Sequence, residues 1–260
     1  MAELILRAPF ATHWRGRDAF AEAFAVQGEE HRALEQRQTL SFVLEGKRYF
    51  IKRHRGASWG EILKNLLLGR LPVVSAHNEW QAIARLGAVG VNTPLAVAYG
   101  RRGLVPSRLQ SFLVTEDVGP HCTLEDYCRD WSHNPPSPRE KWQLIREVAQ
   151  VTRLMHGAGI AHRDYYLCHL LKVEGKAGLT VIDLHRALCK RSLRQRWIIK
   201  DLAGLYFSSL AIGLTQRDYL RFIHDYTAQP LKQAIADAGF WREVEARGMK
   251  TLRREQRKAA

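Results

Sequence analysis

Two carboxylates, Asp164 and Asp183, occupy positions typical of a phosphoryl-transfer site. Asp164 closes a His162-Arg163-Asp164 triplet that stands just before an apolar run, and Asp183 ends a second apolar run that begins at Leu179. In enzymes that transfer phosphoryl groups from ATP, one aspartate accepts the proton of a substrate hydroxyl and another holds Mg²⁺ against the nucleotide phosphates. The pattern therefore predicts ATP as donor, Asp164 as the catalytic base and Asp183 as a ligand of Mg²⁺.

The second loop position of interest is His169, five residues after Asp164. Protein kinases carry a metal-binding Asn at this spacing. Imidazole is a poor ligand for Mg²⁺ beside oxygen donors. Three roles for His169 therefore stand open: a weak metal ligand, a hydrogen-bond partner of Asp164, or a phosphate contact. The glycine found after the second aspartate in protein kinases is missing, and the residues there are Asp183-Leu184-His185.

The charge of the chain points to an acidic partner. Its 260 residues carry 40 Lys and Arg against 26 Asp and Glu, a formal net charge of +14, while 46% of the residues are hydrophobic. The length and hydrophobic content suit one large globular domain or two lobes. The charge suits an anionic membrane surface, an acidic glycan or a small acidic protein. Nucleic acid is not expected, because the chain has no reading motif or interleaved aromatic platform.

Cysteine usage and hydropathy predict the compartment. The four cysteines show no CxxC pair and no metal-ligand spacing, so we expect reduced thiols. The N-terminal residues lack the pattern of a signal peptide, and no run approaches the ~20 apolar residues that a spanning helix needs. We therefore expect a cytoplasmic protein that acts at most on a membrane surface.

The first part of the chain reads as a β-rich lobe. Alternating apolar residues predict strands at 39–44 and 48–53, and a buried strand at 111–116 runs into a glycine-containing segment. A Ser58–Glu61 capping box predicts an inserted helix at 58–70. We place a hinge after Glu116, with a lobe at 1–116 and a second lobe at 117–260. Backbone groups at this hinge are expected to grip the adenine of ATP.

The second part reads as mainly helical. A helix over 139–156 carries a periodic apolar face, and Ser137 or Pro138 starts it. Further helices are expected at 124–131, 197–210, 217–226 and 231–247. The fold class is therefore α+β, with a small β-rich lobe and a helical lobe.

Six residues fall in the order of a kinase along nearly the whole chain: Lys52, Glu79, Asp164, His169, Asp183 and Asp201. With the segments around them, among them Tyr49–Gly56, Asn78–Ile83, Val181–Ala187 and Lys200–Ala203, the chain resembles the lipopolysaccharide core heptose(I) kinase family of Gram-negative bacteria. This resemblance implies a protein-kinase-like fold. It also implies transfer of the γ-phosphoryl group of ATP to the 4-hydroxyl of heptose I in the lipopolysaccharide inner core.

The resemblance also assigns roles in the nucleotide and catalytic loops. Lys52 would face the α- and β-phosphates and Glu79 would hold that lysine. Asp201 would brace the backbone of the catalytic loop, with His162 in structural support. The turn at Arg37 lacks a glycine-rich pattern, so Arg37 is expected to assist where backbone amides usually bind phosphate.

Two other functions remain open from the sequence. A protein kinase, including one that phosphorylates its own tyrosines, would also carry these loops. A kinase fold without activity could serve as a binding module at an anionic membrane. The basic link between Asp183 and the helix that holds Asp201 is short, which favours a glycan acceptor over a docked peptide. Its arginines, among them Arg186 and Arg191, suit sugar carboxylates and phosphates.

Overall fold

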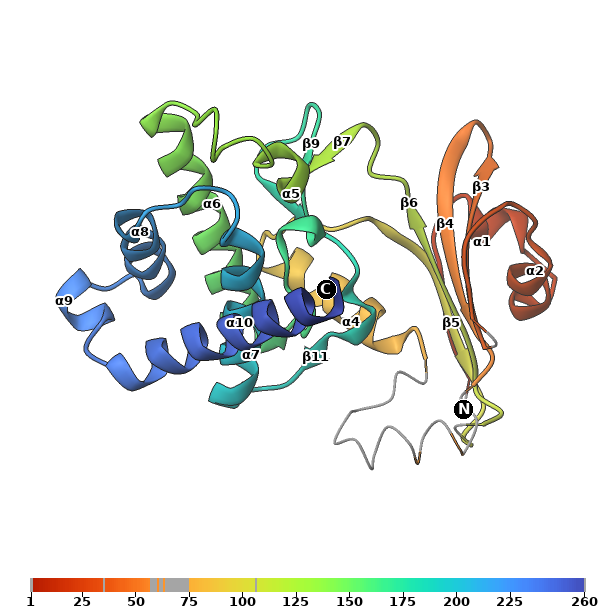
Figure 1. The fold of residues 1–260 in the computed structure, drawn as a ribbon. Coiled ribbons are helices and arrows are strands. Elements are labelled where there is room, and N and C mark those ends of the chain that lie inside the picture. Colours follow the sequence, from red (N-terminus) through yellow and green to blue (C-terminus); the bar gives the residue numbers. More distant parts are fainter. Residues whose placement is uncertain are drawn as a thin grey trace. The chain divides into compact units, whose positions relative to one another are not determined.

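The computed structural model describes residues 2–34, 36–56, 60, 63, 75–105 and 107–259 (Figure 1). The chain divides into two compact units, Met1–Ala84 with Pro94–Val118, and Arg85–Thr93 with Gly119–Ala260. The first contains a β-sheet and the second is mainly helical, which confirms the predicted α+β class. The helix expected at 58–70 lies outside the described residues, apart from Gly60 and Leu63.

The first unit is built on a six-stranded antiparallel sheet with the strand order β1-β5-β6-β4-β3-β2. Helix α4 begins in this unit and ends in the second. The elements are β1 (Glu3–Leu6), α1 (Phe10–His13), α2 (Ala19–Ala25), β2 (Glu29–Leu34), β3 (Arg37–Leu44), β4 (Lys47–His54), α4 (His77–Ala88), β5 (Ala96–Arg102) and β6 (Gln110–Glu116).

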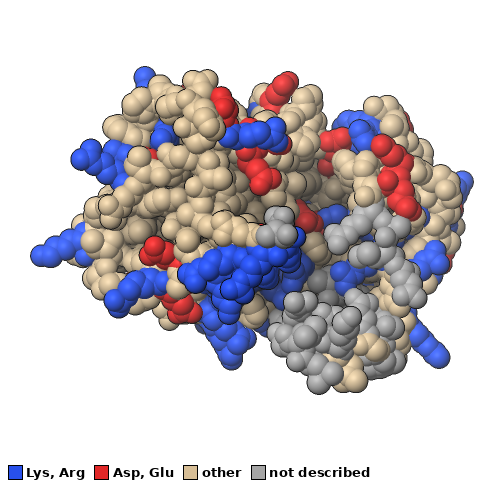
Figure 2. Space-filling view, in the orientation of Figure 1, with Lys and Arg blue, Asp and Glu red and all other residues tan. Residues whose placement is uncertain are grey.

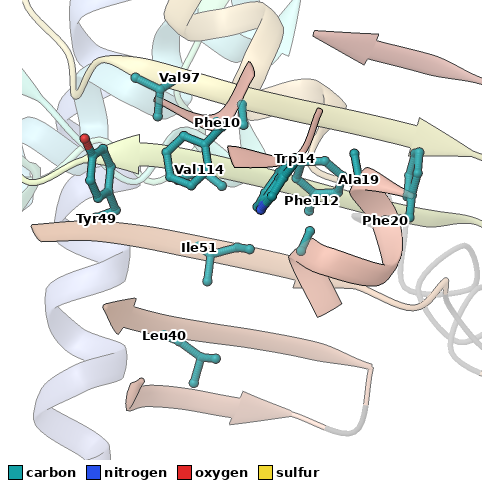
Figure 3. Packing of buried hydrophobic residues seen from close by; sticks show 12 residues of the cluster. Phe10, Trp14, Ala19, Phe20, Leu40, Tyr49, Ile51, Val97, Phe112 and Val114 are labelled. Carbon is teal, nitrogen blue, oxygen red and sulfur yellow. The ribbon is translucent and has the colours of Figure 1, made fainter. Parts of the chain in front are cut away.

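The two faces of this sheet have different coverings. Alternation along β4 sends Tyr49 and Ile51 to one face, where they join an aromatic cluster with Phe10 and Trp14 from the α1 region (Figure 3). The other face receives Trp80 of α4, which stacks on Tyr99 of β5 with ring centroids 5.0 Å apart. Apolar burial on both faces fixes the register of β4, because a slip by one residue would exchange its two sets of side chains.

The second unit surrounds the catalytic-loop region with helices. Its small sheets have the orders β10-β9-β7 and β11-β8. The elements are β7 (His121–Thr123), α5 (Leu124–Tyr127), α6 (Pro138–Gly157), β8 (Ile160–Ala161), η1 (Leu167–His169), β9 (Leu170–Val173), β10 (Leu179–Val181), η2 (Leu184–Arg186), β11 (Leu188–Cys189), α7 (Gln195–Ser209), α8 (Gln216–Thr227), α9 (Leu231–Ala234) and α10 (Ala238–Ala259).

Two expected helices differ from the observed ones. The helix predicted at 124–131 ends at Tyr127, because the next amides bond carbonyls three residues back, as Arg129 does with Asp126. The helix predicted at 231–247 is instead two helices. The Asp237 side chain accepts from the Phe240 amide at 3.0 Å and starts α10 anew, which then continues to Ala259.

Helix α10 packs along α7 (Figure 1). Gly248 allows this approach, since a Cβ there would lie 2.6 Å from Tyr206 Cδ1. Close packing against α7 thus outweighs the low helix propensity of glycine. Among the described helices, none combines the length and apolar character needed to cross a membrane.

Candidate active site

In the first unit, the structure brings Lys52 and Glu79 together. The Lys52 Nζ atom lies 2.6 Å from Glu79 Oε1, and the Glu79 side chain is 6% exposed. Lys52 is aligned with Leu113 of β6, on the sheet face that receives α4, so the helix carries Glu79 to the lysine. The ion pair fixes an otherwise flexible ammonium group at one point of the sheet, where it can meet phosphate oxygens.

Arg37 and Glu116 take different places in the same sheet. Arg37 opens β3 opposite His54, and the pleat puts its side chain on the same face as Lys52. Glu116 ends β6 opposite Tyr49, so its side chain belongs to the other face. The Glu116 amide donates to the Leu95 carbonyl at 2.9 Å. Arg37 is therefore placed to approach the same ligand as Lys52, while Glu116 marks the end of the sheet.

In the second unit, the buried Asp201 of α7 ties down the catalytic loop. Its two carboxylate oxygens accept hydrogen bonds from the backbone amides of His162, at 2.6 Å, and Arg163, at 2.7 Å. Asp201 is completely buried, and His156 Nε2 lies 3.5 Å from it. Arg163 has a left-handed backbone with φ of 73°, which is costly for a residue with a side chain. The Asp201 bonds hold this strained conformation immediately before Asp164.

Helix α7 contacts the loop at three more points. The Lys200 ammonium donates to the Arg163 carbonyl. The Ser208 hydroxyl accepts from the Leu167 amide at 3.1 Å. At Gly204 an added Cβ would lie 2.7 Å from the Tyr165 carbonyl, so only glycine lets the helix pass this close. The loop is therefore seated on one face of α7 from Arg163 to Leu167.

Two cations flank the Asp164 carboxylate. Arg186 Nη1 lies 3.0 Å from Oδ1 and 2.9 Å from Oδ2, and Lys200 Nζ lies 3.8 Å from Oδ1. The pKa of Lys200 is lowered to about 8. Burial is the largest cause and the Arg186 and Arg163 charges act in the same direction, whereas Asp164 and Asp201 oppose the shift. The Asp164 carboxylate is thus held by Arg186, which contacts both of its oxygens, and by Lys200 of α7.

Asp183 lies between two histidines. It has a left-handed backbone with φ of 59°. His185 Nδ1 lies 2.6 Å from Asp183 Oδ1, and His169 Nε2 lies 3.6 Å from Oδ2. His169 Nδ1 also lies 2.6 Å from the Asp164 carbonyl oxygen, so this ring joins the two loops. Burial opposes the charge of His169, but interactions with Cys168 and with the Asp164 carbonyl raise its pKa to about 9.

His162 supports the same arrangement from below. Its Nε2 lies 2.9 Å from the Ile182 carbonyl oxygen, and its ring stacks on His169 with centroids 5.4 Å apart. Complete burial lowers the pKa of His162, so the ring is neutral at neutral pH. The stack of a neutral His162 under His169 fixes the ring plane that faces Asp183.

The Asp183 carboxylate is the group of this loop that suits Mg²⁺ as a ligand. In the described part of the chain, no three His, Cys, Asp or Glu side chains form a preformed metal cage. Mg²⁺ does not need one, because it keeps several waters and is bound through one or two carboxylates plus substrate phosphates. The raised pKa leaves His169 protonated at neutral pH. A protonated imidazole donates hydrogen bonds from both ring nitrogens and has no lone pair with which to bind a metal ion.

A large apolar cavity lies in the second unit, apart from these polar residues. It measures about 690 Å³ and is lined by side chains of α5, α6, α7, α8 and α10, among them Cys128, Val148, Leu205 and Trp241. Packed interiors seldom contain voids much larger than a water molecule, and this volume is in the range of ligand pockets. Burial raises the pKa of the Cys128 thiol to about 12, in keeping with the apolar lining.

Sequence reasoning gave no role to several residues of this site. Lys200 precedes Asp201 in the segment that marks the family, yet only the fold shows that it reaches Asp164. His156 lies in the last turn of α6 and contacts Asp201. His185 contacts Asp183, which lies two residues before it in the chain. The one local signal was the His185-Arg186 pair shortly after Asp183.

A buried lysine–glutamate pair on a sheet, with a braced aspartate loop followed by a second aspartate, defines a kinase-like phosphotransferase. Residues 21–226 match the lipopolysaccharide kinase (Kdo/WaaP) family. The chain belongs to this family, and the resemblance seen in its motifs is confirmed.

Individual relatives agree over nearly the full length. The chain is 49% identical over 261 residues to the lipopolysaccharide core heptose(I) kinase WaaP of Escherichia coli, covering 98% of both chains. It is 48% identical to the protein of the same name from Pseudomonas aeruginosa, covering 98% of this chain and 97% of that one. A solved structure described as WaaP in complex with acyl carrier protein superposes with a TM-score of 0.85 at 43% identity, covering 95% of this chain and 98% of that chain.

Proposed function

We propose that this protein phosphorylates heptose I of the lipopolysaccharide inner core at its 4-hydroxyl, with Mg²⁺-bound ATP as donor. The kinase activity and the heptose I acceptor follow from membership of the family and from relatives of that name along nearly the whole chain. The observation that carries the proposal is the braced Asp164 loop, tied by Asp201 and linked to Asp183 through His169.

Asp164 acts at the acceptor. Its carboxylate lies on a loop fixed by two buried backbone hydrogen bonds, so its oxygens keep one direction. A positioned carboxylate orients the sugar hydroxyl and takes its proton as the bond to phosphorus forms. Because phosphoryl transfer depends mainly on positioning and charge neutralisation, a fixed carboxylate is the main requirement at the acceptor.

Lys52 and Arg37 act at the donor. Glu79 holds the Lys52 ammonium where it can bind the α- and β-phosphates. Arg37 lies on the same sheet face and supplies a second cation for the phosphates. Backbone groups near Glu116 bind the adenine. Asp183 would hold Mg²⁺, which would neutralise the charge on the phosphates, and the His169 ring, 3.6 Å from the Asp183 carboxylate, would keep it oriented through their charges.

Protein phosphorylation is the main alternative activity. Tyr165 is 1% exposed and its hydroxyl lies 2.9 Å from the Thr152 hydroxyl, so it is part of the core rather than a substrate. The segment from Asp183 to the start of α7 at Gln195 is short and contains only η2 and β11. These features favour a sugar acceptor over a peptide that docks on an extended segment.

The large cavity favours a partner that delivers an apolar chain. The solved WaaP relative is in complex with acyl carrier protein, and this chain has a net charge of +14, which suits a small acidic protein. We propose that this protein also binds an acyl carrier protein and that the acyl group enters the cavity beside Cys128. An acyl chain would fill a space that otherwise leaves the surrounding side chains without contacts.

Surface charge and exposed apolar residues favour a peripheral position at the cytoplasmic face of the inner membrane. Figure 2 shows Lys and Arg side chains gathered over the C-terminal half of α10, where Arg247, Lys250, Arg253, Arg254, Arg257 and Lys258 are exposed. In the first unit, Leu104 is 85% exposed and Val105 45% exposed in the turn between β5 and β6. Arginines flank this turn, so it could place apolar side chains among anionic headgroups.

Transfer of labelled γ-phosphate from Mg-ATP to dephosphorylated core lipopolysaccharide tests this function. The wild type and the exposed-site control Asp130→Ala should label the glycolipid, and Asp164→Ala should not. Label that stays on the protein would support the protein-kinase alternative. A folded wild type that labels neither would leave the binding module as the function.

A further inference from the structure

More positive charges surround Asp164 than are needed to neutralise one carboxylate. Arg186 and Lys200 both approach it, at 2.9 and 3.8 Å. Arg163 adds a third cation nearby, but it is 5% exposed, donates to the Arg186 carbonyl at 3.2 Å and lies over the Trp197 ring. Arg163 is therefore committed to the loop, whereas the side chains of Arg186 and Lys200 are 33% and 24% exposed.

Arg186 and Lys200 face the position that an acceptor must occupy. This step rests on the proposed function, in which Asp164 orients the acceptor hydroxyl. Because Arg186 Nη1 contacts both Asp164 oxygens, an incoming hydroxyl has to share or displace that contact. The contact uses one guanidinium nitrogen, while the planar fork of arginine supports paired bonds to an oxyanion from two nitrogens.

We propose that Arg186 and Lys200 form an anion subsite that binds an acidic group on the sugar next to the acceptor hydroxyl, a carboxylate or a phosphate. Before the acceptor binds, Asp164 serves as the anion for both cations. When the acceptor binds, its acidic group takes over the Arg186 contact and Asp164 turns to the hydroxyl. An acceptor without an acidic neighbour leaves Arg186 on Asp164, so the subsite selects acidic glycans.

Burial strengthens this selection. Lys200 is partly desolvated by α7 and the loop, and burial is the largest cause of its lowered pKa. An incoming anion relieves this unfavourable environment, since an opposite charge nearby favours the protonated amine. The two cations also differ in role. Lys200 is anchored to the Arg163 carbonyl, while Arg186 ends the short helix η2 and has the more exposed side chain.

Acceptor modification with matched variants tests the subsite. Steady-state kinetics would compare the wild type, Arg186→Gln, Arg186→Lys and the control Arg153→Gln, which removes an exposed charge from α6. Each enzyme would receive core lipopolysaccharide that lacks only the phosphate on the 4-hydroxyl of heptose I, here called intact core, together with its carboxyl-reduced form and fully dephosphorylated core. Thermal unfolding would verify that each variant is folded.

The wild type and Arg153→Gln should lose about 10- to 100-fold in kcat/KM when the recognised anion is removed from the acceptor, through a higher KM. Arg186→Gln should show a similar loss on intact core and little further loss on the modified core, and Arg186→Lys should restore part of the discrimination. Loss on carboxyl reduction identifies a carboxylate, and loss on dephosphorylation identifies a phosphate.

Two results would overturn the subsite. One is an Arg186→Gln enzyme that discriminates among the three acceptors as the wild type does. The other is a rise in the KM for ATP instead of the acceptor, which would make Arg186 a nucleotide contact. Either result leaves the proposed kinase function intact, because that function is tested separately by wild-type transfer and its loss in Asp164→Ala.

Discussion

The buried Asp201 provides the sharpest test of how the catalytic loop is held. In Asp201→Asn, one carboxylate oxygen becomes an amide NH₂ while the shape of the side chain is kept. The two backbone amides that now bond Asp201, those of His162 and Arg163, compete for the one remaining oxygen. One buried N–H therefore loses its acceptor.

The magnitude follows from that unpaired group. A buried donor without a partner costs about 1–3 kcal/mol, and bonds to an ionised acceptor are at the strong end of the range. Because domains are typically stable by about 5–15 kcal/mol, the variant should remain folded. The loop, however, should relax at Arg163, directly before Asp164. Displacement of a reacting group by about 1 Å can reduce the rate about 100-fold, so kcat should fall by about that factor.

A second buried aspartate supplies the control. Asp218 is 3% exposed and caps α8, accepting from the Thr215 amide at 2.9 Å. Asp218→Asn should cost about 1 kcal/mol, typical of a helix cap, and leave kcat within about twofold. Urea unfolding, steady-state kinetics and hydrogen exchange at the His162 and Arg163 amides would be measured for both variants. Full kcat in Asp201→Asn, or equal losses in the two variants, would refute the bracing role.

Three further predictions concern pH, the cavity and the membrane. Lys200, with a pKa of about 8, loses its charge as pH rises through that value, so kcat/KM for an acidic acceptor should fall above about pH 8. Lys200→Arg should shift this fall to higher pH, and an unshifted profile would exclude Lys200 as its cause. Cys128→Phe should fill part of the cavity and abolish the thermal stabilisation given by an acylated carrier protein; unchanged stabilisation would place the acyl group elsewhere. Leu104→Glu should lower co-sedimentation with phosphatidylglycerol vesicles about tenfold, while Val43→Glu, at another exposed apolar residue, should not; equal effects would reject the β5–β6 turn as the contact.

Local signals in the sequence were sufficient for several elements. Asp18 stands just before the alanine-rich helix α2, and its Oδ1 accepts from the Phe20 amide at 2.8 Å as the N-cap. The long helix expected at 139–156 is α6, Pro138–Gly157, started by Ser137. These features depend on side chains within a few residues of the backbone they bond, so short-range patterns suffice to predict them.

Short-range patterns failed to predict helix bounds that depend on packing between residues distant in the sequence. The last helix was expected to end at 247, yet α10 continues to Ala259, and Gly248 fits against Tyr206 of α7. Its separation from α9 depends on Asp237 and on the bond from Trp241 Nε1 to the Ala234 carbonyl at 2.7 Å. Intrinsic propensity alone does not contain these contacts.

In the candidate site too, some residues could be recognised from the sequence, whereas other contacts depend on the fold. The order of Lys52, Glu79, Asp164 and Asp183 could be recognised because each residue type is tied to a step of phosphoryl transfer. Their roles stay predictions. The Lys200 contact to Asp164 could not be foreseen, since it joins residues that are 36 positions apart through the packing of α7 under the loop.

The most direct test is the position of the new phosphate. Dephosphorylated core lipopolysaccharide would be incubated with Mg-ATP and the wild-type protein, and the product glycan examined by phosphorus–proton correlation NMR. The account predicts one new phosphate ester at the 4-position of heptose I, absent with Asp164→Ala. A phosphate on another sugar, or a modified protein with an unmodified glycan, would contradict it.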